Sequence, residues 1–163
     1  MAGVPIYQTP ILAEWIDYNG HLRDAYYTLI ASLATDALME RVGLDAAYRA
    51  RSGCTLYTLE MHLHFLAEVK RDDVVSVELR LLGVDHKRIH AAFEILRRGS
   101  AAPAAAAELM LLHVRQDGER VSSAPFPAHV SAALAALHAQ SAALPAAAAG
   151  SRRMALPGPP PPP

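Results

Sequence analysis

Residues 15–27, WIDYNGHLRDAYY, place several groups that could do chemistry just before a long apolar segment. They comprise two carboxylates, an amide, a glycine and an imidazole: Asp17, Asp24, Asn19, Gly20 and His21. A helix start needs one capping side chain and at most an acid in its first turn, and this set exceeds that requirement. The stretch therefore indicates that a carboxylate here has a catalytic role, with simple helix capping by Asp17 as the alternative.

The segment of residues 23–42 is predicted to form a long, mostly enclosed helix. Apolar residues cover most of its surface at helical spacing, namely Tyr26, Leu29, Ile30, Leu33, Ala34, Ala37 and Leu38. A narrow polar stripe remains, formed by Thr28, Ser32, Thr35 and Asp36. Arg41 in the last turn and Gly43 just beyond it are the expected stop signals.

The next segment, residues 57–65, alternates as a strand with one polar face does. One side is expected to carry Tyr57, Leu59, Met61, Leu63 and Phe65, and the other Thr58, Glu60, His62 and His64. If the polar side lines a cleft, Glu60 is a second carboxylate, able to orient water or to balance a cationic group. Exposure of that face to solvent is the alternative.

The remaining pattern completes an α+β domain. Further strands are expected at residues 4–13, 74–82, 88–96 and 105–114, and a short helix at 128–137. GVDHK and RRGSAAP join the last three strands as hairpins, which predicts an antiparallel meander. Because one nearly all-apolar helix accompanies a run of antiparallel strands, the sheet must wrap around that helix to bury it.

Length and composition predict one domain over residues 1–139 and an Ala- and Pro-rich disordered tail over residues 140–163.

The net charge is −1 and the basic residues are dispersed, so no nucleic-acid partner is expected. No apolar run approaches the roughly 20 residues that span a bilayer. A single cysteine, Cys54, and the absence of a signal-peptide pattern predict a cytoplasmic protein.

Several histidines and basic residues allow further hypotheses. His62, His64, His86 and His90 match no closed zinc pattern, and cysteine ligands are absent, so no metal site is expected. Lys87 and Arg88 fall at a predicted surface hairpin, where they could meet phosphate groups or simply be solvated.

The order of Asp17, Gly20, His21 and Tyr27 before a long helix resembles the hotdog-fold acyl-CoA thioesterases of the 4-hydroxybenzoyl-CoA thioesterase type. The resemblance extends from about Pro10 to Leu137. Within this family, the stretches DYNGH, ATDAL, TLEMH and DHKRIH look most like the betainyl-CoA thioesterases. Many relatives carry two asparagines at the positions of Arg23 and Asp24, so this chain departs from the pattern there.

The resemblance implies hydrolysis of a small acyl-CoA, such as betainyl-CoA, to the free acid and CoA, with no cofactor beyond the CoA of the substrate. It implies a homodimer whose sheets join edge to edge, or a dimer of such dimers, with the thioester held at the interface. Asp17 would be nucleophile or general base, and a main-chain N–H near Asp24 would polarise the carbonyl. From the residues themselves, His21 could orient Asp17 or contact the carbonyl oxygen, with a structural hydrogen-bonding role as the alternative, and Glu60 is the second catalytic candidate.

Other residues would then bind substrate. Those expected to contact the acyl thioester are Asn19, Gly20, Asp24, Tyr27, Thr58 and His62, and those expected to contact CoA phosphates are Lys87 and Arg88. A trimethylammonium group would be attracted by aromatic faces, for which Trp15, Tyr18, Tyr26 and Tyr57 are available. Two alternatives remain open: a hotdog dimer that binds an acyl-CoA without cleaving it, and a hotdog hydratase or dehydratase.

Overall fold

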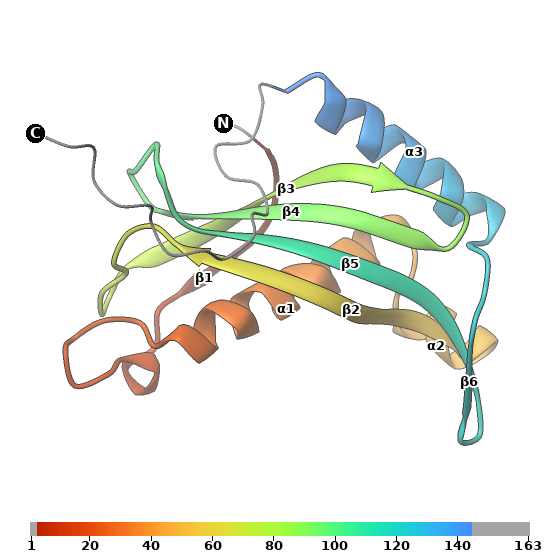
Figure 1. Cartoon of the computed structure of the whole chain (residues 1–163), viewed down its shortest axis with the longest axis horizontal. Coiled ribbons are helices and arrows are strands. Elements are labelled where there is room, and N and C mark those ends of the chain that lie inside the picture. The colour runs from red at the N-terminus through yellow and green to blue at the C-terminus, as the bar shows by residue number, and fades with distance from the viewer. Residues whose placement is uncertain (1–2, 145–163) are drawn as a thin grey trace, which may run out of the picture.

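One antiparallel sheet and one long helix make up most of the molecule (Figure 1). The computed structural model describes residues 3–144. Along the chain the elements are β1 Val4–Pro10, the 3-10 turn η1 Ala13–Trp15, α1 Asp24–Val42, α2 Ala46–Ser52, β2 Cys54–Phe65, β3 Val74–Val84, β4 Arg88–Arg97, β5 Pro103–Asp117, β6 Arg120–Ser123 and α3 Ala128–Ala142. The predicted order of strand, long helix, four strands and final helix is confirmed, and α2 and β6 are additional.

The strands pair in the order β1-β3-β4-β5-β2, all antiparallel, and β6 pairs with β5. The predicted meander is therefore present as β3-β4-β5. β2 pairs only with β5, and within residues 3–144 no strand pairs with its other edge. This leaves a twelve-residue edge strand with one row of unpaired backbone groups.

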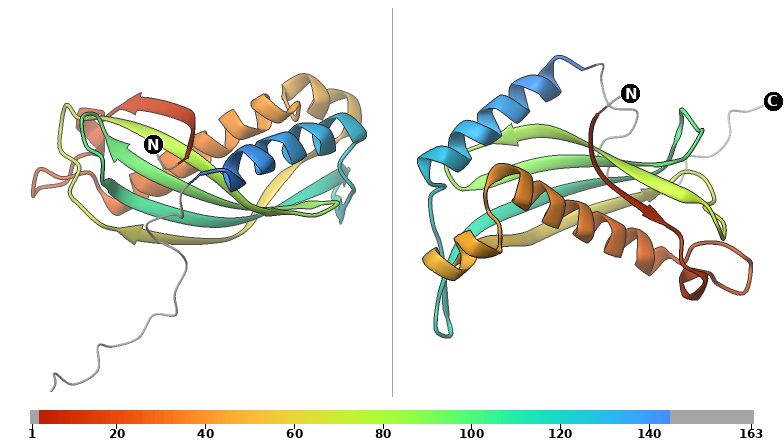
Figure 2. Two further views of the ribbon diagram at one scale, coloured as in Figure 1. Left: turned by 90° about the horizontal axis from the view of Figure 1, so that it is seen from above. Right: turned by 180° about the vertical axis from the view of Figure 1, so that it is seen from behind.

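Helix α1 lies across one face of the sheet, which is the face turned toward the viewer in the right panel of Figure 2. Its buried side chains recur at helical spacing: Tyr27, Ile30, Ala31, Ala34, Thr35, Leu38 and Val42. The helix ends where the sequence predicts, because Gly43 adopts φ +85° and its N–H donates to the Glu40 carbonyl.

The core is formed where α1 packs on the inner face of the sheet. Alternate residues of β3, β4 and β5 point toward the helix and are almost fully buried: Val75, Val77, Leu79, Ile89, Ala91, Phe93, Ile95, Ala105, Ala107, Leu109 and Leu111. The sheet therefore covers the apolar arc of α1 as the sequence pattern requires. None of the helices between residues 3 and 144 is long and apolar enough to cross a membrane.

Helix α3 lies along β3 (Figures 1 and 2), beside the part of that strand that β1 leaves unpaired. The Ser141 hydroxyl accepts the Leu81 N–H at 3.0 Å, which satisfies a backbone donor at this edge. The helix ends at Ala142, three residues beyond the boundary expected at residue 139. Residues 145–163, most of the expected tail, lie outside the described part of the chain.

The two additional elements are short. In α2, Asp45 is the N-cap and accepts the Tyr48 N–H at 2.7 Å, and Gly53 ends the helix at φ +67°. In β6, the strand returns along β5 after Gly118, which has φ +59°. The signals for these two elements are local: a capping aspartate and a later glycine for α2, and an Asp-Gly turn for β6. Apolar periodicity alone does not reveal them.

Candidate active site

Asp17 lies in a tight loop that leads directly into α1. Its Oδ1 accepts the main-chain N–H of Asn19 at 2.8 Å and that of His21 at 3.0 Å. Its Oδ2 makes only a long 3.5 Å contact with the Asn19 amide. One carboxylate oxygen is therefore held by the backbone, and the other is available to a substrate.

The loop geometry depends on Gly20. Its φ is +81°, in the region that side-chain-bearing residues rarely adopt, and its N–H donates to the Asp17 carbonyl at 3.1 Å. The space around it is open, because an added Cβ would meet no atom within 4 Å. Gly20 is therefore required for the backbone conformation of the turn, and not because a side chain there would collide with neighbouring atoms.

The hydrogen bond from the His21 main chain is the largest cause of a lowered pKa at Asp17, and the Asn19 bonds add to it. Asp17 is therefore fully ionised at neutral pH, the state that either base or nucleophile catalysis needs. The His21 ring does not contact Asp17 as the sequence suggested it might. Its Nε2 lies 3.0 Å from Oε2 of Glu68, while its main chain holds the carboxylate.

Glu68 is a site residue that the sequence analysis did not identify. It lies between β2 and β3, about fifty residues from the motif, and neither periodicity nor spacing connects the two segments. They meet through the fold: the Leu22 N–H donates to the Val69 carbonyl at 2.8 Å, and His21 forms an isolated bridge with Lys70.

The first turn of α1 offers a free amide. Arg23 is the N-cap but makes no side-chain cap, and the Asp24 carboxylate accepts the Ala25 N–H at 2.8 Å. Within residues 3–144 no acceptor meets the N–H of Asp24 itself. This N–H lies at the position where the resemblance places the donor for a developing oxyanion, and its catalytic role stays a prediction.

Tyr27 has a packing role in the single chain. It is 4% exposed, and its ring meets Phe65 edge to face at a centroid distance of 5.2 Å. Burial is the main cause of the raised pKa of Tyr27. Trp15 likewise stacks on Tyr26 at 5.2 Å, so one of its faces is already covered.

A β-bulge corrects the expected faces of β2. Thr58 pairs with Leu111 and Glu60 with Met110, so Leu59 is the extra residue. Because directly paired residues share a face, Thr58 lies on the inner side with Leu111, whereas Glu60 and His62 lie on the outer side. The prediction that Thr58 shares the face of Glu60 is wrong, since a bulge shifts the alternation by one residue.

Glu60 and His62 are close to each other, and the described chain does not bring them to Asp17. Oε1 of Glu60 lies 2.8 Å from Nε2 of His62, and both side chains are largely exposed. Their face of the sheet is the one opposite α1. A second pair of the same kind, His90 with Glu108 at 2.6 Å, lies beside them on this outer face.

Lys87 and Arg88 lie at the far end of the sheet from the Asp17 loop (Figure 1). The loop packs near the start of β3 and the hairpin follows its end, eleven residues and about 35 Å away. The Arg88 guanidinium is bound to Asp85 at 2.7 Å, and Lys87 reaches the Ser123 hydroxyl at 3.2 Å. Within one chain these groups cannot serve the Asp17 site.

The family model described as the thioesterase-like superfamily matches residues 11–134. This chain belongs to the thioesterase-like superfamily. A betainyl-CoA thioesterase from Pseudomonas aeruginosa is 50% identical over 151 residues, which are 93% of this chain and 94% of that protein. A crystal structure from Pseudomonas putida KT2440 has a TM-score of 0.83 at 42% identity and covers 97% of this chain and 99% of its own. A Staphylococcus aureus protein in complex with CoA also has a TM-score of 0.83, at 26% identity and coverages of 96% and 98%.

The hotdog fold of this thioesterase is confirmed by these likenesses and by the crystal structure of a 4-hydroxybenzoyl-CoA thioesterase. That structure has a TM-score of 0.73 at 16% identity and covers 82% of this chain and 99% of its own. The protein is accordingly a thioester hydrolase, as the sequence motif predicts.

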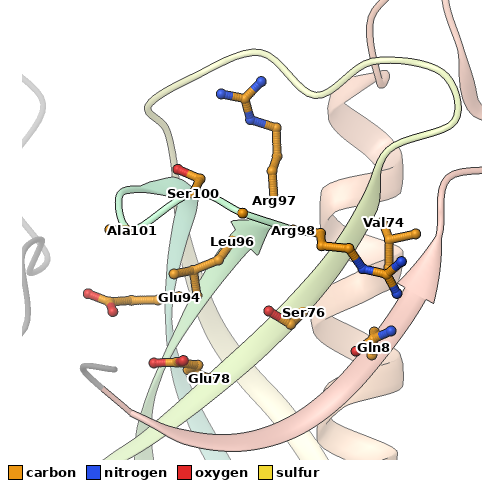
Figure 3. A pocket seen from close by; sticks show the side chains of 11 residues that line it. Gln8, Val74, Ser76, Glu78, Glu94, Leu96, Arg97, Arg98, Ser100 and Ala101 are labelled. Carbon is orange, nitrogen blue, oxygen red and sulfur yellow. The ribbon is translucent and has the colours of Figure 1, made fainter.

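Hollows in the thioesterase surface lie away from Asp17. One of about 530 Å³ is on the outer face, where Figure 3 shows the carboxylates of Glu78 and Glu94 pointing the same way from β3 and β4. Another of about 240 Å³ contains Glu60 and His62. A third of about 530 Å³ lies between α1, α2 and the start of β2. Asp17 lines none of these three hollows.

The acidic and imidazole groups do not form a metal site. Among residues 3–144, no group of three or more His, Cys, Asp or Glu side chains is arranged to hold a metal ion.

Proposed function

We propose that this thioesterase hydrolyses betainyl-CoA to the free acid and CoA, with Asp17 attacking the thioester or activating the water that does. The observation that carries the proposal is the Asp17 carboxylate, which has one oxygen held by two main-chain N–H groups and the other in only a long 3.5 Å contact with the Asn19 amide. The 50% identity to a betainyl-CoA thioesterase over nearly the whole of both chains supports the choice of acyl group.

The carbonyl oxygen would be stabilised by the start of α1. Charge develops on this oxygen as the carbon is attacked, and the N–H of Asp24 has no acceptor within the described chain. The positive end of the helix dipole adds to the attraction. One such donor contributes about 3 kcal/mol to transition-state stabilisation in other acyl-transfer enzymes.

The lowered pKa of Asp17 favours nucleophilic attack over general-base catalysis. A general base works best when its pKa is close to the operating pH, and this carboxyl lies well below it. A nucleophile needs only to be ionised and correctly aimed. Attack by Oδ2 on the carbonyl carbon would break the C–S bond, release CoA as its thiolate and form a mixed anhydride that water then cleaves.

The acyl cation would lie near the reacting carbon, because only one methylene separates the ammonium from the carbonyl in betainyl-CoA. Tyr18 follows Asp17 directly, and its ring is 94% exposed in the single chain. An aromatic face and a carboxylate together are the surroundings that a trimethylammonium group favours. We therefore assign Tyr18, rather than Trp15, which is only 9% exposed, to this contact.

A homodimer would complete the site. The free edge of β2 exposes apolar side chains, with Leu59 and Phe65 each 56% and Leu66 50% exposed. Two copies of this edge related by a two-fold axis run antiparallel, so the Cys54 end of one lies beside the Phe65 end of the other. The third hollow and the Lys87 hairpin of the partner would then approach the Asp17 loop.

Lys87 of the partner would be available to CoA phosphates, whereas Arg88 is already bound to Asp85. The CoA complex of the S. aureus relative supports binding of this moiety. We place the enzyme in the cytoplasm, where acyl-CoA esters are found.

The test is thiol release from betainyl-CoA and from its neutral isostere, tert-butylacetyl-CoA, which differ only in the charge of the acyl group. The proposal predicts that kcat/KM for betainyl-CoA exceeds that for the isostere by about tenfold or more, in line with a desolvated cation–π contact. Equal values for the two esters would overturn the assignment of a cationic acyl group while leaving thioester hydrolysis intact.

A further inference from the structure

An ion pair connects the Asp17 loop to the segment between β2 and β3. Nε2 of His21 lies 3.0 Å from Oε2 of Glu68, and Nζ of Lys70 lies 3.9 Å from the same oxygen. No role is given to Glu68 by the catalytic scheme above. Glu68 is nevertheless close to the reacting carboxylate, because it contacts the His21 ring, and the main-chain N–H of the same histidine donates to Asp17.

Among residues 3–144, the other hydrogen-bonded contacts between the Asp17 loop and this segment involve main-chain groups. The Leu22 N–H donates to the Val69 carbonyl at 2.8 Å, and His21 pairs with Lys70 in an isolated bridge. These contacts hold the main chain of the loop in place and do not involve the His21 ring. The Glu68 carboxylate is what fixes the direction of the ring.

We propose that Glu68 is a positioning residue, which holds the His21 ring in one orientation and thereby fixes the aim of Asp17 Oδ2. This inference rests on the proposed role of Asp17. A carboxylate at Nε2 selects the tautomer with hydrogen on that nitrogen, as it does for histidines in other catalytic sites. The ring and the peptide N–H of His21 then form one rigid link from Glu68 to the Asp17 carboxylate.

A contribution to stability alone does not account for the pair. The two side chains are 32% and 62% exposed, and ion pairs this exposed add little to folding. The chain offers a matched comparison in His90 and Glu108, which form the same kind of pair at 2.6 Å on the outer face. Because Glu108 lies on the face of the sheet opposite α1, it serves as the control.

The experiment compares two variants of equal size in the full-length protein. Glu68→Gln keeps an oxygen that can accept from Nε2, whereas Glu68→Met does not. With betainyl-CoA, Glu68→Met is expected to lower kcat about tenfold with KM unchanged, and Glu68→Gln to keep at least half of kcat. Glu108→Met should leave kcat unchanged.

A double-mutant cycle separates positioning from general support of the fold. If Glu68 acts through His21, then Glu68→Met in a His21→Ala background lowers kcat no further, although both variants unfold at the same temperature as the parent. A kcat of Glu68→Met within twofold of the parent, or losses that multiply in the double variant, would overturn the inference. Retention of activity by Asp17→Asn would instead refute the proposed function.

Discussion

The main-chain N–H of His21 donates to Oδ1 of Asp17 at 3.0 Å, and this bond is the largest cause of the lowered pKa of that carboxyl. Because the folded value lies below the usual 3.8, the reactive carboxylate persists as the pH falls toward that value and is lost only beneath it. If Asp17 acts as proposed, the acid limit of catalysis lies well below neutrality.

The first prediction concerns this pH dependence. In a His21→Ala variant, which removes the neighbouring imidazole, kcat/KM on betainyl-CoA should stay level from pH 7 down to about pH 5. Stopped assays of thiol release across this range test it. An acid limb centred near pH 6 in that variant would contradict the assignment of an unusually acidic Asp17.

The second prediction concerns the oxygen that enters the product. In a single turnover in water labelled with oxygen-18, Asp17 attacks the thioester and water then attacks the Asp17 carboxyl carbon of the anhydride, so that an unlabelled Asp17 oxygen leaves with the acid and the label enters Asp17. Mass spectrometry of the released acid and of the peptide containing Asp17 measures both. Label in the acid and none in Asp17 would contradict this route, because water would then have attacked the acyl carbon and not the Asp17 carboxyl carbon.

The third prediction concerns Gly20, whose φ of +81° disfavours residues with a side chain. Gly20→Ala should lower the free energy of unfolding by about 1 kcal/mol, since the strain is conformational and no atom crowds the site. Gly20→Asn should lose less, because asparagine tolerates this region better. Denaturant unfolding of the two variants distinguishes them, and equal stabilities would argue against a strained turn.

The fourth prediction concerns the free edge of β2. Leu59→Lys places a charge on an apolar edge side chain that is 56% exposed, and it should yield a monomer with little activity. Leu82→Lys, at a 39% exposed position on β3, is the control and should leave the dimer intact. Light scattering after size-exclusion chromatography gives the mass of each. A dimeric Leu59→Lys protein would exclude this edge as the interface.

The fifth prediction concerns Asp85. The Lys87 main-chain N–H and the Arg88 side chain lower its pKa to about 2. Its contribution to stability is thus present above the unfolded value of 3.8 and is lost as the pH falls through about 2. Asp85→Asn should flatten the decline of the melting temperature across that window. A decline identical to that of the parent would show that another acid is responsible.

Local pattern was sufficient for much of this fold. The apolar surface of α1, its glycine stop and the hairpin-joined strands are each specified by residues close together in the chain, and each is present in the structure. Short α2 and β6 went unpredicted because their signals are a single cap and a single turn.

The site was less predictable, because part of it depends on contacts between distant segments. The motif at Asp17 and the free N–H of Asp24 follow from the local sequence. The side of the sheet on which Thr58 lies does not follow from the local sequence, because the bulge at Leu59 depends on pairing with β5. The contact between His21 and Glu68 likewise arises only when the segment after β2 folds back on the loop.

The most direct test of the central claim is the rate of thiol release from betainyl-CoA by Asp17→Asn. This change keeps the shape and one acceptor oxygen but removes the charge. The account predicts a protein with unchanged unfolding temperature and a kcat at least about 10³-fold lower than that of the parent. A folded Asp17→Asn enzyme that turns over at a near-normal rate would contradict it.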